Sequence, residues 1–223
     1  MENLPTIRPV PYLTQLMWRC ESRVRQLGKP EDLSGGRMRA VTEELADPRS
    51  LSVRRVIVEL ERHVATAGWD APVRVFALVK TAAALQRDPS LGSRLPTEVI
   101  NASQEDPDHL TAVEQEGLPQ AQNLEELLHQ IAWPESVDGC AVVVERTVLP
   151  PEVEEQIPDD EESAAAWIEQ HPDRRDVRLG AAVLRSGEYC CAVRARDHDA
   201  DDNVAVGRDL APGLVEGVAA TLD

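Results

Sequence analysis

The chain has 223 residues and a formal net charge of −17, and it is 42% hydrophobic but only 3% aromatic. This length suffices for one sizeable core, built mainly from valine, leucine and alanine. The acidic balance argues against a nucleic-acid partner and against an anionic membrane, because both need clustered lysine and arginine. No apolar run approaches the ~18 residues of a transmembrane helix, and no N-terminal secretion signal precedes the body. We therefore expect a soluble cytoplasmic protein.

Residues 1–37 differ in composition from the rest of the chain. They hold six basic against four acidic side chains, with prolines near the start and glycines near the end. Apolar residues between Leu13 and Leu27 recur at helical spacing, which indicates either a short amphipathic helix or a loosely attached extension. Met38 follows directly, so translation could also start there and omit the segment. We expect one α+β domain over residues 38–223.

The clearest helix is predicted over Ser52–Gly68, where a continuous apolar stripe includes His63. A lone histidine in such a stripe is more often a packed core residue than a ligand. Next, the run from Val73 is rich in β-branched residues and predicts a strand, followed by an alanine-rich helix to Arg87. The alternative is one helix through the whole of 73–87, and the periodicity leaves both open.

Residues 96–109 read as a polar loop, and Leu110 begins a strand that ends at Glu116. His109 and Glu114 are candidates for acid–base or metal chemistry, although their spacing matches no ligand signature. Asn123 then opens a second helix, with Glu126 placed to complete a capping box. The segment 140–149 is apolar on both faces and predicts a buried strand.

Residues 151–176 carry ten carboxylates against two arginines. Such a charge run is usually a solvated face. Within it, Asp159 or Asp160 can cap a helix that ends before Pro172.

The segment 176–197 reads as one tight hairpin. Alternate residues are apolar on both sides of a turn at 185–187, and a three-residue loop keeps them on a common face. This register pairs Val183 with Tyr189 and Leu179 with Val193, with Gly187 in the left-handed position. A slip by one residue would turn every side chain to the other face.

The opposite hairpin face carries Arg178, Arg194 and Arg196, and the first two lie directly opposite each other. Opposed like charges repel, so an anionic group is expected nearby. These arginines are candidates to bind an anionic ligand or partner. The interpretation we favour is that the chain's own carboxylates cover them, with the acidic segment 151–176 well placed to do so.

After the hairpin, Asp197, Asp199 and Asp201 fit positions one, three and five of a calcium-binding loop. Position six is Asp202 instead of glycine, and position twelve is Arg208 instead of glutamate, so the pattern fails at the turn and at the bidentate ligand. An acidic surface loop is the better interpretation, and a cation site is the alternative. From Asp209 the chain predicts a terminal helix.

The four cysteines have no spacing typical of a zinc or redox site, and we expect buried free thiols. No phosphate-binding loop, nucleophile elbow or metal signature is present, so we expect no catalytic, cofactor or metal site. The predicted architecture is α+β: an antiparallel or mixed sheet of about five strands with helices mainly on one face.

Two functions fit these observations. The first is a non-catalytic module that binds or regulates another protein, and we favour it. The second is a small-molecule-binding protein or hydrolase that uses His109 and Glu114, or His198 and Asp199. Enzymatic activity is therefore uncertain, with the balance against it.

Several short stretches resemble a known family: Leu60–Pro72, Thr111–Pro119, Ile131–Pro134, Val137–Ala141 and Arg196–Asp199. Together they resemble an uncharacterised actinobacterial family catalogued under a Propionibacterium locus tag. The resemblance covers about residues 53–223 and leaves the N-terminal segment outside. It implies a cytosolic bacterial protein of unknown function, and it transfers no activity and no functional residues.

Overall fold

The computed structural model describes residues 47–150, 153, 156–158 and 160–223. Its centre is a six-stranded sheet in the order β2-β1-β3-β4-β5-β6, in which every neighbouring pair is antiparallel. The predicted α+β class is confirmed, with one strand more than the five or so expected. The predicted extension at 1–37 lies outside the described residues.

Strands and helices are interspersed along the chain. The strands are β1 (Arg74–Lys80), β2 (Leu110–Glu114), β3 (Gly139–Val148), β4 (Arg175–Leu184), β5 (Tyr189–Ala195) and β6 (Ala205–Gly207). The helices are α2 (Pro48–Ala65), α3 (Thr81–Arg87), α4 (Thr97–Glu105), α5 (Leu124–His129), α7 (Glu161–Gln170) and α8 (Pro212–Ala220). Short 3-10 turns are η2 (Pro89–Ser93), η3 (Arg196–His198) and η4 (Asp201–Asn203).

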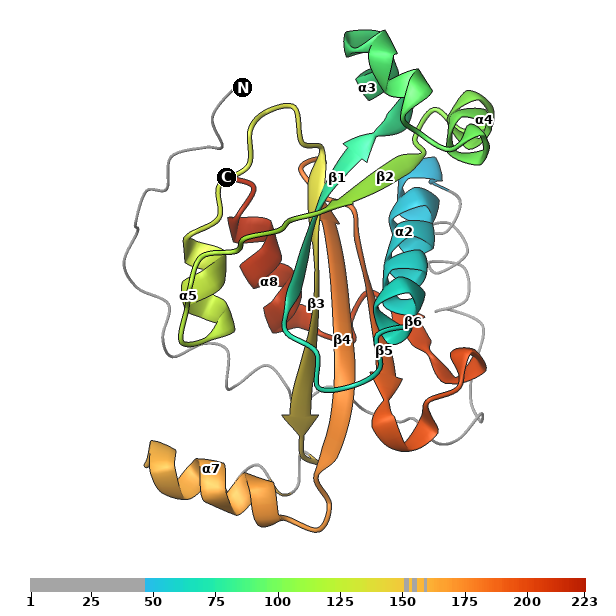
Figure 1. Cartoon of the computed structure of the whole chain (residues 1–223). Helices are drawn as coiled ribbons and strands as arrows, with labels where there is room; N and C mark the ends of the chain where they lie inside the picture. The colour runs from blue at the N-terminus through green and yellow to red at the C-terminus, as the bar shows by residue number, and fades with distance from the viewer. Residues whose placement is uncertain (1–46, 151–152, 154–155, 159) are drawn as a thin grey trace.

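Helices cover both faces of the sheet, so the expectation that they lie mainly on one face is wrong. Helix α2 packs on one face through Ile57 and Leu60, whereas α5 and α8 cover the other (Figure 1). The reason lies in the central strands, which are apolar on both sides. Val143 of β3 faces the α2 layer, and Val142 faces the opposite core.

The predicted hairpin register is confirmed. Strands β4 and β5 pair Val183 with Tyr189 and Leu179 with Val193. Gly187 has a φ of +98°, which is the left-handed conformation that the three-residue loop requires. The register also brings Arg178 opposite Arg194, as expected from the sequence.

Several element boundaries differ from those expected. Helix α2 begins at Pro48, because the Asp47 carboxylate accepts a hydrogen bond from the Ser50 N–H (3.1 Å) and proline is favoured at the first helical position. Residues 97–105 form α4 and not a loop. The strand-then-helix interpretation of 73–87 is confirmed. The side chain of His63 is 57% exposed and not part of the core.

Gly139 opens β3 where three strands meet, opposite Leu78 on one side and Leu184 on the other. A Cβ atom at this position would lie 2.4 Å from the Val183 carbonyl oxygen and 3.1 Å from the Leu184 Cα. Backbone atoms therefore fill the space that any larger residue would need.

The three described cysteines, Cys140, Cys190 and Cys191, are buried free thiols. Burial raises the pKa of the Cys140 and Cys191 thiols from 9.0 to about 12, and it also raises the pKa of Cys190. Because the thiolate is the reactive form, we expect none of the three to react with a disulfide reagent at pH 8 in the native protein.

This expectation is checked in a Cys20→Ser variant, which removes the thiol outside the described residues. The three thiols should react only when denaturant unfolds the chain. Rapid stoichiometric labelling of any of them under native conditions would contradict the packing described above.

Candidate functional site

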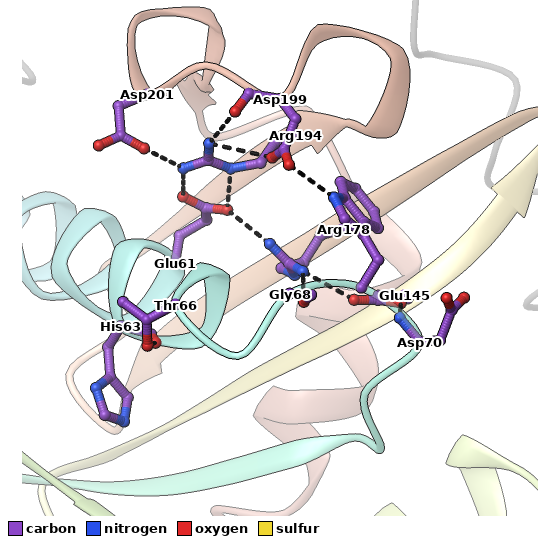
Figure 2. Close-up of polar contacts among 11 residues, drawn as sticks. Glu61, His63, Thr66, Gly68, Asp70, Glu145, Arg178, Arg194, Asp199 and Asp201 are labelled. Carbon is purple, nitrogen blue, oxygen red and sulfur yellow. Dashed lines mark hydrogen bonds and ion pairs between the residues drawn. The ribbon is translucent and has the colours of Figure 1, made fainter.

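A buried ion cluster lies between α2 and the hairpin β4–β5. Arg178 and Arg194 project from the paired strands beneath α2, and both are at most 1% exposed. Glu61 of α2 lies between them and is fully buried (Figure 2). The Arg194 fork donates from Nε to Oε1 (2.6 Å) and from Nη2 to Oε2 (2.7 Å) of Glu61. This bidentate geometry is the strongest arrangement of an arginine with a carboxylate.

Arg194 also binds the loop that follows β5. Its Nη2 donates to Asp201 Oδ1 (2.8 Å), and its Nη1 donates to the Asp199 carbonyl oxygen (3.2 Å). The hydrogen bond to Glu61 is the main cause of a raised pKa for the Arg194 guanidinium, with Asp201 adding to it. In the other direction, Arg194 lowers the pKa of Asp201.

Arg178 has fewer polar contacts than Arg194. Its Nη2 donates to Glu145 Oε1 (2.9 Å) and to the Gly68 carbonyl oxygen, and its Nη1 lies 3.6 Å from Glu61 Oε1. Its Nε and Nη1 make no hydrogen bond within the described part of the chain. The Trp69 ring lies over the guanidinium, with 4.4 Å from Cζ to the ring centroid, and provides a cation–π contact in place of a further acceptor.

The segment 68–70, here called the Trp69 loop, lies between α2 and β1 and contacts β3, β4 and the segment that follows β5. Trp69 Nε1 donates to Asp199 Oδ2 (2.9 Å), and the Asp70 N–H donates to Glu145 Oε2 (2.6 Å). Asp70 accepts from both Nη atoms of Arg196 at 2.8 Å each. Arg196 also contacts the Trp69 ring, with Cζ 5.5 Å from the centroid.

A surface hollow of about 490 Å³ adjoins this cluster. It is lined by Asp70, Glu145, Arg146, Thr147, Ile168, Arg174, Asp176 and Arg196. Its position follows from the sheet topology: the register of β1 with β3 ends at the pair Arg74–Val143, whereas β3 continues to Val148 paired with β4. Residues 144–148 therefore have a strand neighbour on one edge, and no described residue forms a second ladder on the other.

A protein-family model described as PPA1309-like protein matches residues 53–223. The chain belongs to the PPA1309-like family. The match spans the ion cluster, the Trp69 loop and the hollow, and it confirms the resemblance noted from the sequence. No curated protein and no solved structure matches the chain. The PPA1309-like family is of uncharacterised function.

The carboxylates that meet the arginines of this PPA1309-like chain come from unexpected segments. From the sequence we expected carboxylates of residues 151–176, but Glu61 comes from α2, Glu145 from β3, and Asp199 and Asp201 from the loop after β5. From the acidic segment, the described contact is that of Asp176, whose Oδ2 lies 3.7 Å from Arg196 Nη1.

The candidate cation loop is engaged within the protein. Asp199 and Asp201 bind Arg194, and Asp197 Oδ1 lies 3.0 Å from His198 Nδ1. Across the described ranges, no group of three histidine, cysteine or acidic side chains is placed to hold a metal ion.

The structure gives His109 and His198 contacts other than the carboxylates suggested as their partners. His109 Nδ1 hydrogen-bonds to Thr81 Oγ1 (2.9 Å) at one end of β2, whereas Glu114 binds Arg74 at the other end (2.6 Å). Asp199, the suggested partner of His198, contacts Trp69 and Arg194 instead.

Sequence reasoning missed Glu61, although a signal for it was present. Glu61 is four residues after Ile57 and three before Val64, which places it on the buried stripe of the helix. A glutamate at such a position predicts a buried cationic partner, because an unpaired charge in a core is strongly unfavourable. The sequence supplied that partner in the opposed arginines of the hairpin.

Proposed function

We propose that this chain is a non-catalytic cytoplasmic module that binds an extended segment of a partner protein beside the charged hollow, along the edge of β3 at residues 144–148, where no described residue pairs with the strand. The observation that carries the proposal is the length of β3. Its pairing with β1 ends at Val143, whereas its pairing with β4 continues through residues 144–148. An unpaired strand edge presents backbone N–H and C=O groups that an added strand can bind. Main-chain pairing of this kind is a common mode of peptide recognition.

The lining of the hollow favours a protein partner over a small apolar ligand. Pockets for small molecules are mostly apolar, with a few polar groups for orientation. Here three arginines, three carboxylates and Thr147 accompany one apolar residue, Ile168. A polar lining of this composition is typical of the rim of a protein interface.

Two further observations support the proposal. The histidines considered for catalysis contact residues other than the carboxylates suggested as their partners: His109 hydrogen-bonds to Thr81, and His198 contacts Asp197. The free state of Cys140, Cys190 and Cys191 fits a reducing compartment. Apart from these two observations, the helices of the described residues include none with the length and hydropathy of a membrane span.

The test is purification of the tagged full chain from its native host, together with an Arg146→Glu variant. Arg146 is exposed on β3 and lines the hollow, so reversing its charge should disrupt docking without disturbing the core. We expect a stoichiometric protein to accompany the wild type and to fall at least tenfold in the variant.

Arg94→Glu is the matched control, because Arg94 is exposed and outside the hollow. It makes the same charge change and should retain the partner. Repeated recovery of the wild-type protein alone, or equal recovery of the partner with both variants, would refute the proposal. Circular dichroism of each variant establishes that the fold is intact.

A further inference from the structure

Arg196 already holds a carboxylate at the margin of the hollow. Both Nη atoms donate to the two carboxylate oxygens of Asp70, at 2.8 Å each. The pair is open to solvent, since the Arg196 side chain is 42% exposed and that of Asp70 is 73% exposed. Fork-to-fork contact is the geometry in which arginine binds carboxylates in general, so Asp70 occupies a position that another carboxylate could take.

The backbone at Asp70 is held in a sparsely populated conformation. Its φ is +65°. Within the described part of the chain, Asp70 is the one non-glycine residue with a positive φ. Such a conformation persists only where surrounding contacts maintain it. Here the contacts are the N–H bond to Glu145 and the carboxylate bond to Arg196. If Asp70 loses its contact with Arg196, the Trp69 loop is still held by the Asp70 N–H bond to Glu145 and by the Trp69 bond to Asp199.

The other groups of the hollow favour an added negative charge. The Glu145 carboxylate is bound by Arg178 and by the Asp70 N–H, and Asp176 accepts a hydrogen bond from the Thr147 hydroxyl (2.9 Å). The lining carboxylates are thus already engaged by donors of the protein. Arg146 is exposed and makes no ion pair with a described residue.

We infer that Asp70 is an internal competitor that occupies Arg196 until a carboxylate side chain of the partner segment displaces it. The inference rests on the proposed function and specifies the partner: an extended segment with an acidic residue beside the β3 edge. Arg196 is then the residue that binds the acidic side chain of the partner segment. Displacement also removes one of the ties of the Trp69 loop, so binding and loop position are coupled.

The test measures the affinity of the full chain for a fluorescein-labelled hexapeptide of alternating valine and glutamate, by fluorescence anisotropy. Asp70→Asn should raise the affinity about fivefold, the upper range for loss of an exposed ion pair. Asparagine tolerates a positive φ, so the loop geometry is retained. In an Arg196→Gln background, the same Asp70→Asn change should have no effect on peptide affinity, because the guanidinium for which Asp70 and the peptide compete is absent.

Two controls separate recognition from net charge. A peptide with glutamine in place of glutamate should bind the wild type and Asp70→Asn equally. Asp202→Asn removes the same charge from an exposed aspartate outside the hollow and should leave acidic-peptide affinity unchanged.

Three results would overturn the inference: no binding of the acidic peptide by Asp70→Asn, an equal gain with Asp202→Asn, or a gain that survives Arg196→Gln. If the partner nevertheless purifies with the wild type and is lost from Arg146→Glu, the proposed function stands and the role of Asp70 alone is refuted.

Discussion

Replacing Glu61 with glutamine is expected to lower the free energy of unfolding by about 3–5 kcal/mol, the usual cost of removing one partner from a buried ion pair. Glutamine has nearly the same shape, so the change isolates the charge. Its amide N–H₂ would face the Arg194 donors, which now lie 2.6 and 2.7 Å from the carboxylate oxygens. Arg178, with Nη1 3.6 Å from Glu61, would lose its second carboxylate. Urea unfolding at 25 °C measures the difference.

Glu59→Gln is the matched control for this measurement. Glu59 lies on the exposed side of α2, two residues before Glu61. We expect its replacement to change stability by less than about 0.5 kcal/mol, as for most surface positions. If the two variants were equally stable, Glu61 would not be the charge on which the packing of α2 depends.

The second large effect is expected for Gly139→Ala, which should destabilise the fold by about 2–3 kcal/mol through overpacking. The added methyl group would lie 2.4 Å from the Val183 carbonyl oxygen. This neighbour is backbone inside the β3–β4 ladder, so it cannot move aside as the end of a side chain could. The midpoint of urea unfolding should fall with little change in slope.

Gly92→Ala provides the comparison for that variant. The nearest atom to a Cβ at Gly92 is Leu85 Cδ2 at 3.9 Å, an ordinary contact. Its effect should therefore be close to zero, or slightly stabilising through the unfolded chain. Similar losses for both variants would show that the clash at Gly139 is relieved at little cost.

The hairpin was predictable from the sequence because two local patterns agree. Alternation of apolar residues defines the buried face, and Gly187 supplies the left-handed residue of the turn, so the register follows without knowledge of other segments. Helix α4 was missed because its residues are mostly polar and because it lies between Pro96 and Pro107. Polar residues flanked by prolines favour the prediction of a loop. Strand β6 has only three residues, too few for a periodicity.

The site was predictable only in part. The opposed arginines follow from the hairpin register, and so does the expectation of carboxylates nearby. Which carboxylates meet them depends on how α2 lies across the sheet and where the loop after β5 turns back. Glu61 could have been inferred from its place on the buried stripe of α2, but the placement of the other carboxylates arises from packing between segments far apart in the chain. The hollow has the same origin, because it exists where β1 ends before β3 does.

The separation of Glu61 from Arg194 has a consequence for synthesis on the ribosome. The two residues are 133 positions apart, which corresponds to on the order of 10 s of translation at typical rates. During that interval α2 has emerged without the cations that neutralise its buried face. Stable docking of the helix must therefore wait for the hairpin, and the nascent chain should become resistant to proteolysis late and in one step.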